Sequence, residues 1–384
     1  MSSSTEPHKS GAAGLSYDSH ALRSMRNVVL AGIGLSWALC LSYSARMSSA
    51  DVFPHGDIER IFGPLAGRRF AILGIGGGGD ITSTVPMCLQ FERLGATVVP
   101  GGLTWKRRVH DPTHRPRAIS EFKNVRTIAP CVGIGRDDME TVDGVQHVEA
   151  FISASLGGRE VLVIDPSPGG AAVAAGLRDA ARDLGLDGII GVDVGGDMLC
   201  DGFEATLESP LCDQTLMFAL AQSRSPVVLA SLGTDGEIHP QDFIARFRAV
   251  HRNGGFRGAF VPHEEDLETW ERVVRGAQTE SSKHALGVYR SLSCEQRRAI
   301  YEKLRLDPLH AIESHLVEPQ ALPLRNGART GHLSPLTAFY FVFDSGIVWG
   351  SGQFSLMWQP DLSIERMHEV LTARGIVTEF SEAP

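Results

Sequence analysis

The sequence predicts an α/β fold with a Rossmann-like, doubly wound, mostly parallel sheet and a C-terminal α+β extension. Short, continuously apolar segments such as 69–73 and 188–192 alternate with segments of helical periodicity such as 171–184. Turns rich in Gly and Asp join each apolar segment to the helix that follows. Strands that are apolar on both faces are typical of a parallel sheet with helices on both sides.

The composition is that of an ordinary globular protein, and it excludes some classes of function. The 384 residues are 43% hydrophobic and 21% charged, which is enough for one large domain or two. The net charge of −9 is opposite to the basic balance of most nucleic-acid-binding proteins, so we expect no nucleic-acid partner. The six cysteines include no Cys-x-x-Cys pair, so neither a zinc site nor a disulfide framework is indicated.

The chain divides into three regions by composition. Residues 1–50 form an N-terminal extension, expected to be disordered apart from the uncharged, largely apolar run 28–45. This run is either a membrane anchor or a segment outside the functional domain. We expect a cytoplasmic protein without a membrane partner, and the anchored form is the alternative. Residues 51–278 predict the Rossmann-like core, and residues 279–384 predict the α+β extension packed on that core.

The expected elements of the core follow one another in strand–turn–helix order. The strand 69–73 leads through a glycine turn to a helix over 81–94, and a second strand covers 96–100. Further strands are expected at 161–164, 188–192, 226–230 and 258–261, and further helices at 171–184, 210–222, 241–252 and 263–278. In the C-terminal region we expect a strand at 337–343 and helices at 295–305 and 362–374. The turns between strands and helices then lie at the carboxyl edge of the sheet, where open α/β sheets bind ligands.

The turn after the first strand is a glycine loop, Gly74-Ile75-Gly76-Gly77-Gly78-Gly79-Asp80. Glycine permits positive φ and lets a phosphate approach the backbone, and the following helix offers free N–H groups to an anion. The spacing fits a dinucleotide-binding loop, but the second strand is followed by Gly101-Gly102-Leu103-Thr104, without an acid to hold a ribose. We therefore expect Gly76, Gly77, Gly78, Gly79 and Asp80 to bind a phosphate-bearing ligand such as a nucleotide. An NAD(P) cofactor is a less favoured alternative, and a purely structural tight turn is another.

Carboxylates stand at or just beyond the ends of the expected strands, at Asp80, Asp165, Asp193, Asp197, Asp235 and Glu237. Because these strand ends meet at one edge, several carboxylates should share a crevice, where a cation, a hydroxyl-rich ligand or a proton must relieve their repulsion. Oxygen ligands suit Mg²⁺ or Mn²⁺. We expect Asp193, Asp197 and Asp235 to bind such a metal, and Asp193, Asp197 and Glu237 to be catalytic. The alternative is that each Asp caps a helix or bonds its own turn.

A cationic segment, 105–117, follows the second strand. It contains Lys106, Arg107, Arg108, Arg115 and Arg117, with His110 and His114. Guanidinium groups bind phosphate or carboxylate bidentately, and an indole stacks on a base or a sugar. We expect Trp105, Arg107 and Arg108 to hold the anionic ligand at the rim of the sheet. The alternative is a solvated basic loop with Trp105 in the core.

These same stretches resemble the family called domain of unknown function 1152 (DUF1152). The similarity rests on LGIGGGGD (73–80), GLTWKRRVHDP (102–112), GVDVGGDMLCDGFEATLESPLCD (191–213) and TDGEI (234–238), within a region of roughly residues 60–345. The resemblance implies a domain identity and assigns no functional residues. It does not extend to residues 1–50, which favours placing the apolar run outside the functional domain.

Together, these features favour an enzyme that acts on a nucleotide or a phosphorylated sugar, as a transferase or a hydrolase. The glycine loop and the cationic segment would bind the phosphate, and the carboxylates would bind a divalent metal or act as acid and base. Two alternatives stay open, an NAD(P)-dependent oxidoreductase and a non-catalytic nucleotide-binding sensor or assembly protein. The expected partner is a small phosphorylated molecule, and a homo-oligomer is compatible with the sequence.

Overall fold

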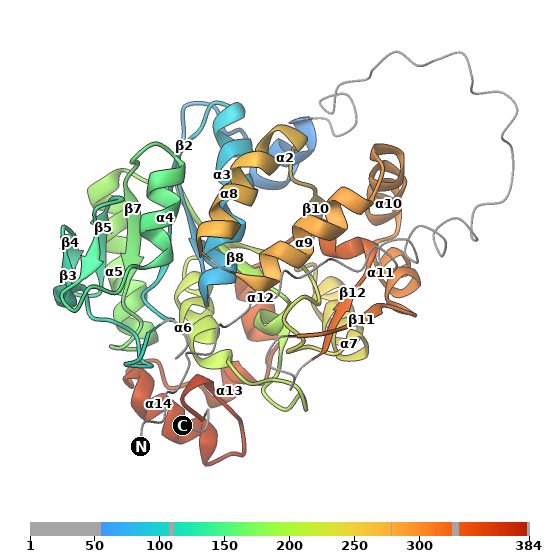
Figure 1. The fold of residues 1–384 in the computed structure, drawn as a ribbon. Coiled ribbons are helices and arrows are strands. Elements are labelled where there is room, and N and C mark those ends of the chain that lie inside the picture. Colours follow the sequence, from blue (N-terminus) through green and yellow to red (C-terminus); the bar gives the residue numbers. More distant parts are fainter. Residues whose placement is uncertain (1–54, 107–110, 278, 325–329, 382–384) are drawn as a thin grey trace, which may run out of the picture. The chain divides into compact units, whose positions relative to one another are not determined.

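The computed structural model describes residues 55–106, 111–277, 279–324 and 330–381 (Figure 1). The expected N-terminal extension, with its apolar run 28–45, lies outside these residues. Within the described part of the chain, no helix is both long enough and apolar enough to cross a membrane.

A nine-stranded sheet organises these residues. Its strands are β1 (Arg69–Gly74), β2 (Thr97–Leu103), β4 (Arg126–Ala129), β5 (Val132–Gly135), β7 (Val161–Ile164), β8 (Gly188–Val194), β9 (Pro226–Ala230), β10 (Phe256–Phe260) and β13 (Tyr340–Asp344). Their spatial order is β10-β13-β9-β8-β1-β2-β7-β5-β4. The run from β9 to β7 is parallel, and antiparallel strands flank it on both sides. The predicted α/β fold with a mostly parallel sheet is confirmed.

Successive strands join the sheet first on one side of β1 and then on the other side. From β1 the chain passes through α3 (Gly78–Arg93) to β2, then reaches β7, and returns through α5 (Gly170–Leu184) to β8 on the other side of β1. Because parallel crossovers are right-handed, the two directions place α3 and α5 on opposite faces of the sheet. The crevice between the carboxyl ends of β1 and β8 is therefore a topological switch point, where open α/β sheets bind ligands.

Helices cover the sheet on both faces (Figure 1). α3 packs with α4 (Val148–Ser155), α8 (Leu267–Ala277) and α9 (Glu280–Ser291), whereas α5 packs with α6 (Pro210–Ala221), which also contacts α12 (Ser345–Gly350). The other helices described are α2 (His55–Phe62), α7 (Pro240–Arg252), α10 (Cys294–Leu306), α11 (Pro308–Leu316), α13 (Phe354–Met357) and α14 (Ile364–Thr372). Two small sheets pair β3 (Phe122–Lys123) with β6 (Glu140–Thr141), and β11 (Gln320–Pro323) with β12 (Thr330–Leu333).

α3 is anchored on two sides, which fixes the glycine loop at its start. Met87 and Phe91 pack with Ile72 of β1, while Val85 packs in a second cluster with residues of α4 and α8. These side chains are fully buried. Burying each of them contributes roughly 1.5–3 kcal/mol, so the position of the loop is set by the core rather than by the loop itself.

The C-terminal region supplies a strand of the main sheet. β13 lies between β9 and β10 and is antiparallel to both. The strand expected at 337–343 begins later than predicted, at Tyr340, because the hydroxyl of Ser334 caps a short 3-10 turn over Pro335–Ala338. The proposed boundary between residues 278 and 279 stays a prediction.

Candidate functional site

Six carboxylates gather at the carboxyl ends of β1, β8 and β9. They form two groups, within each of which carboxylate oxygens lie within 4.8 Å of one another: Asp80, Asp193 and Asp213 in the first group, and Asp197, Asp235 and Glu237 in the second. Asp80 lies in the first turn of α3, Asp193 in β8 itself, and Asp213 in the first turn of α6. The first group therefore lies at the switch point between β1 and β8.

Asp193 is the most deeply buried side chain of this first group. It is fully buried, and neither of its carboxylate oxygens has a hydrogen-bond partner of ordinary geometry among the described residues. Burial raises the pKa of Asp193 to about 6, and the charge of Glu237 adds to the shift, against the lowering effect of the Asp197 side chain and the backbone of Met198 and Val194. A buried, ionised carboxylate without a partner is strongly destabilising unless a cation or a proton compensates it.

The neighbours of Asp193 share its electrostatic environment. Burial raises the pKa of Asp80, Asp197 and Asp213 well above the usual range, and repulsion from the other carboxylates raises it further. The charged groups with the largest effect on these side chains are all carboxylates. Such an accumulation of negative charge in a dry crevice is what a hard divalent cation with oxygen ligands compensates.

The second group is held by hydrogen bonds of its own. One oxygen of Glu237 accepts from the backbone N–H groups of Glu208 (3.1 Å) and Ser209 (2.8 Å), and the other accepts from the Ser209 hydroxyl. Asp235 accepts from the Glu237 N–H at 3.0 Å. Gly195 has a φ of +106°, and a Cβ there would collide with the Asp235 carboxylate. These contacts fasten the loop after β9 to the start of α6.

The expected metal ligands are consequently divided between the two groups. Asp193 lies in the first group, whereas Asp197 and Asp235 lie in the second. Asp165, another candidate, lies apart from both groups and accepts a hydrogen bond from the Ser167 N–H at 2.8 Å, as in the alternative of an Asp that bonds its own turn. The first group fits a cation better, because it contains Asp193, the most deeply buried of the six carboxylates.

The glycine loop needs small residues for space rather than for backbone conformation. None of its glycines adopts the positive φ that glycine permits. A Cβ at Gly76 would collide with carboxylate oxygens of Asp213 and Asp80, so only a glycine lets the backbone pass this close to the first group. Gly77, in contrast, faces open space, and no side chain caps the start of α3 there. This helix start is open to an anion.

Two other helices begin beside the glycine loop. A Cβ at Gly78 would lie 3.1 Å from Val148 at the start of α4 and 3.5 Å from Thr279, which precedes α9. The ammonium group of Lys106 donates to the backbone oxygen of Gln146, next to α4, at 2.6 Å. The positive ends of three helix dipoles thus lie around the loop, and the Lys106 ammonium group lies next to the start of α4.

The predicted anion clamp after β2 is only partly described. Trp105 is buried, and its ring lies 5.2 Å from the ring of His114 and 5.6 Å from that of Phe380. Arg107 and Arg108 lie outside the described residues. The roles proposed for these three residues in ligand binding stay predictions.

Two arginines of the same segment are engaged in ion pairs. The Arg117 guanidinium is buried and donates to both oxygens of Asp111, at 2.7 and 2.8 Å. Arg115 donates to both oxygens of Glu121, each at 2.7 Å. These bonds hold the loop together, so any clamp depends on the remaining cations of the segment.

Glu379 is a residue of the site region that sequence reasoning missed. Its two oxygens accept from the backbone N–H groups of Leu211 (2.9 Å) and Cys212 (2.7 Å), at the start of α6. Burial raises the pKa of Glu379 to about 7. The next residue along α6 is Asp213, so Glu379 fixes the helix turn that presents Asp213 to the first group. No local pattern marks this contact, because its partners lie 168 residues apart.

Comparison with known proteins identifies a family for this chain. A family model described as "Protein of unknown function (DUF1152)" matches residues 71–322. No curated protein and no solved structure matches the chain. The matched region contains the glycine loop and both carboxylate groups, whereas β13 and Glu379 lie beyond it. Because the match covers more than half of the sequence and includes the resemblance noted at residues 73–80 and 191–213, the chain belongs to the DUF1152 family.

Proposed function

We propose that this protein is an enzyme dependent on a divalent cation, which acts on a nucleotide or a phosphorylated sugar as a transferase or hydrolase. One observation carries the proposal: the oxygens of the buried Asp193 carboxylate make no hydrogen bond of ordinary geometry with the described residues, and Asp193 lies with Asp80 and Asp213 at the switch point of the sheet. The glycine loop beside it supplies an open helix start. A cation site next to an anion site suits a phosphate ester.

Different residues are proposed to hold the cation, to bind the phosphate and to supply a proton. Asp80, Asp193 and Asp213 would hold Mg²⁺ or Mn²⁺, which polarises a phosphoryl oxygen when bound. The backbone of Gly77, Gly78 and Gly79 would bind the phosphate at the start of α3. Burial and repulsion from Asp213 and Asp193 raise the pKa of Asp197 well above its usual range, and a carboxyl group with a raised pKa suits the role of an acid.

An NAD(P)-dependent reaction has less support. β2 ends at Leu103 and is followed by Thr104, whose hydroxyl donates to the backbone oxygen of Arg117 at 2.6 Å. The position that would hold a ribose in a nicotinamide-binding domain therefore has no carboxylate.

Gly77→Ala is expected to weaken phosphate binding without lowering stability. Gly77 has a φ of −82°, which alanine adopts freely, and a Cβ there would have no atom within 4 Å. The added methyl group would occupy the space through which a phosphate reaches the start of α3. With ATP, ADP and glucose 6-phosphate as probes, each with MgCl₂, titration calorimetry should show at least tenfold weaker binding, about 1.4 kcal/mol.

Gly287→Ala is the matched control. Gly287 is an exposed residue of α9 that also has no atom within 4 Å of an added Cβ. It should bind the probes like the wild type. Equal affinities for the Gly77 variant, or no binding of any probe to the wild type, would remove the support for the phosphate site.

A further inference from the structure

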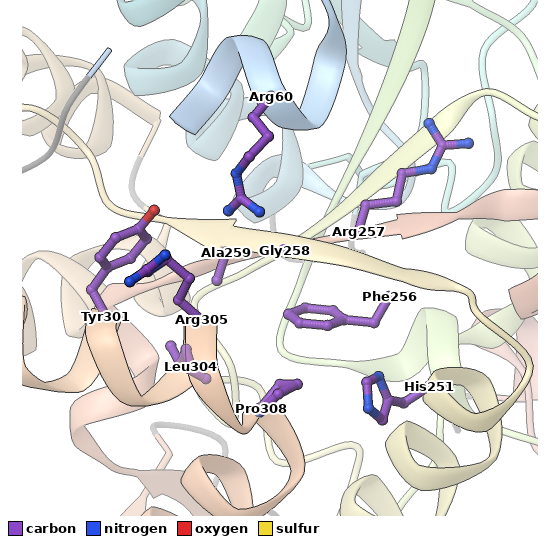
Figure 2. A pocket seen from close by; sticks show the side chains of 10 residues that line it. All are labelled: Arg60, His251, Phe256, Arg257, Gly258, Ala259, Tyr301, Leu304, Arg305 and Pro308. Atoms are coloured by element: carbon purple, nitrogen blue, oxygen red, sulfur yellow. The ribbon is translucent and has the colours of Figure 1, made fainter. Parts of the chain in front are cut away.

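A hollow of about 240 Å³ lies between α2, the edge strand β10 and α10 (Figure 2). β10 is antiparallel to β13, which is antiparallel to β9. The first residue of β10, Phe256, therefore lies at the amino edge of the sheet, whereas the carboxylate groups lie at the carboxyl edge. The hollow is thus separate from the candidate site described above.

The hollow is lined by cations in a protein whose net charge is −9. Three of the ten residues that line it are arginines, and none of these ten is acidic. Two of the arginines are exposed and pair along their own helices, Arg60 with Asp57 (3.4 Å) and Arg305 with Glu302 (3.1 Å). Such exposed pairs contribute about 0–1 kcal/mol, so an incoming anion can replace the carboxylates at little cost.

The two ends of the hollow differ in chemistry. In Figure 2, Arg60 and Arg305 lie with Tyr301 toward one end, and Phe256, His251 and Pro308 lie toward the other. Burial and the hydrogen bond to Asp57 raise the pKa of Tyr301, so its hydroxyl stays protonated and is already engaged with Asp57. One end therefore offers donors to an anion, and the other offers a ring and apolar atoms.

We propose that this hollow binds a small organic anion in which a phosphate or carboxylate is joined to a flat ring. Arg60 and Arg305 would hold the charged group bidentately. The ring would lie against Phe256 and Pro308. The hollow is smaller than the roughly 300–1,000 Å³ of pockets that hold drug-sized ligands, so it suits a single ring with its anionic group rather than a dinucleotide.

Titration calorimetry with phenyl phosphate, benzoate and inorganic phosphate tests this proposal. We expect at least one of the two ring-bearing anions to bind, and inorganic phosphate to bind at least tenfold more weakly. Arg60→Ala and Arg305→Ala should each weaken the binding of that probe about tenfold. Arg182→Ala is the matched control, because Arg182 is also an exposed arginine paired at i,i+3, with Asp179 at 3.1 Å; it should bind like the wild type.

The outcomes separate this site from the proposed function. Asp193→Asn should bind the ring-bearing anion with wild-type affinity, because Asp193 lies at the opposite edge of the sheet. Two results would overturn the proposal: no heat of binding from either ring-bearing anion at millimolar concentration, or binding that survives both arginine replacements. Inorganic phosphate binding as tightly as phenyl phosphate would refute the part assigned to the ring. Far-UV circular dichroism verifies that the three arginine variants, whose replaced side chains are exposed, and Asp193→Asn all fold.

Discussion

Replacing Asp193 by asparagine is expected to stabilise the cation-free protein and to abolish its binding of divalent cations. The carboxylate is fully buried and makes no hydrogen bond of ordinary geometry with the described residues, and burial raises its pKa from 3.8 to about 6. Each pKa unit corresponds to about 1.4 kcal/mol, so at pH 8 the ionised side chain lowers the free energy of unfolding by roughly 3 kcal/mol. Asparagine has nearly the same shape and carries no charge, so the penalty disappears together with the cation ligand.

Two measurements examine this prediction. Urea unfolding at pH 8 in EDTA should give a higher midpoint for Asp193→Asn than for the wild type, and calorimetry should show loss of Mn²⁺ binding. Asp183→Asn is the control, because Asp183 is an exposed acid paired with Arg126 at 3.3 Å, and its loss should leave both measurements nearly unchanged. A lower midpoint in EDTA together with wild-type Mn²⁺ affinity would show that Asp193 is a structural residue.

Without divalent cations, the protein is expected to lose stability as the pH rises from about 5 to 8. Burial raises the pKa of Asp193 to about 6 and that of Glu379 and of Glu149, in α4, to about 7. The folded state therefore binds protons more tightly than the unfolded state, in which these groups titrate near pH 4. Stability falls between the unfolded and the folded pKa, by up to roughly 3 kcal/mol for each group.

Carboxylates with lowered pKa values change the stability of the protein in a different range of pH. The Arg117 guanidinium holds the pKa of Asp111 at about 2, against the effect of its burial, and Arg115 lowers that of Glu121 to about 2. Their stabilisation is complete above pH 5 and is lost only as the pH falls toward 2. The cation-free protein should therefore be most stable near pH 5.

Adding Mg²⁺ or Mn²⁺ should reduce or reverse the loss of stability between pH 5 and 8. A cation binds the ionised carboxylates, so its affinity grows as they lose their protons. Urea unfolding between pH 4.5 and 8.5, once in EDTA and once in millimolar MgCl₂, compares the two conditions. Stability that rises from pH 5 to 8 in EDTA would contradict the assignment of an uncompensated carboxylate cluster.

The sequence predicts where the site lies better than it predicts which residues form it. Apolar segments followed by Gly and Asp place Asp193 and the glycine loop on one edge of the sheet, because both signals are local. The composition of the first carboxylate group depends on tertiary contacts. Asp213 is not among the site residues expected from the sequence, and it reaches the group only because Gly76 leaves room for it. Glu379 belongs to the far end of the chain and has no local signal.

The cationic segment shows a second reason why sequence reasoning is incomplete. Five cations within residues 105–117 predict an anion clamp, but composition does not say which cations are already paired. Arg117 is held by Asp111, six residues before it in the same segment, and Arg115 by Glu121, six residues after it. An acid six residues from an arginine in the chain can form an ion pair with its guanidinium. Such an arginine is then not available to bind an anionic ligand.

The place of β13 has a consequence for synthesis on the ribosome. β9 ends at Ala230, but the strand that pairs with its outer edge begins at Tyr340. At roughly 5–20 residues per second, the nascent chain spends about 5–20 s between these two points. Throughout that interval β9 presents an unpaired apolar edge, with Val227, Val228 and Leu229 along it. Exposed edges of this kind recruit other strands, so this protein has a period during translation in which chaperones would protect it from aggregation.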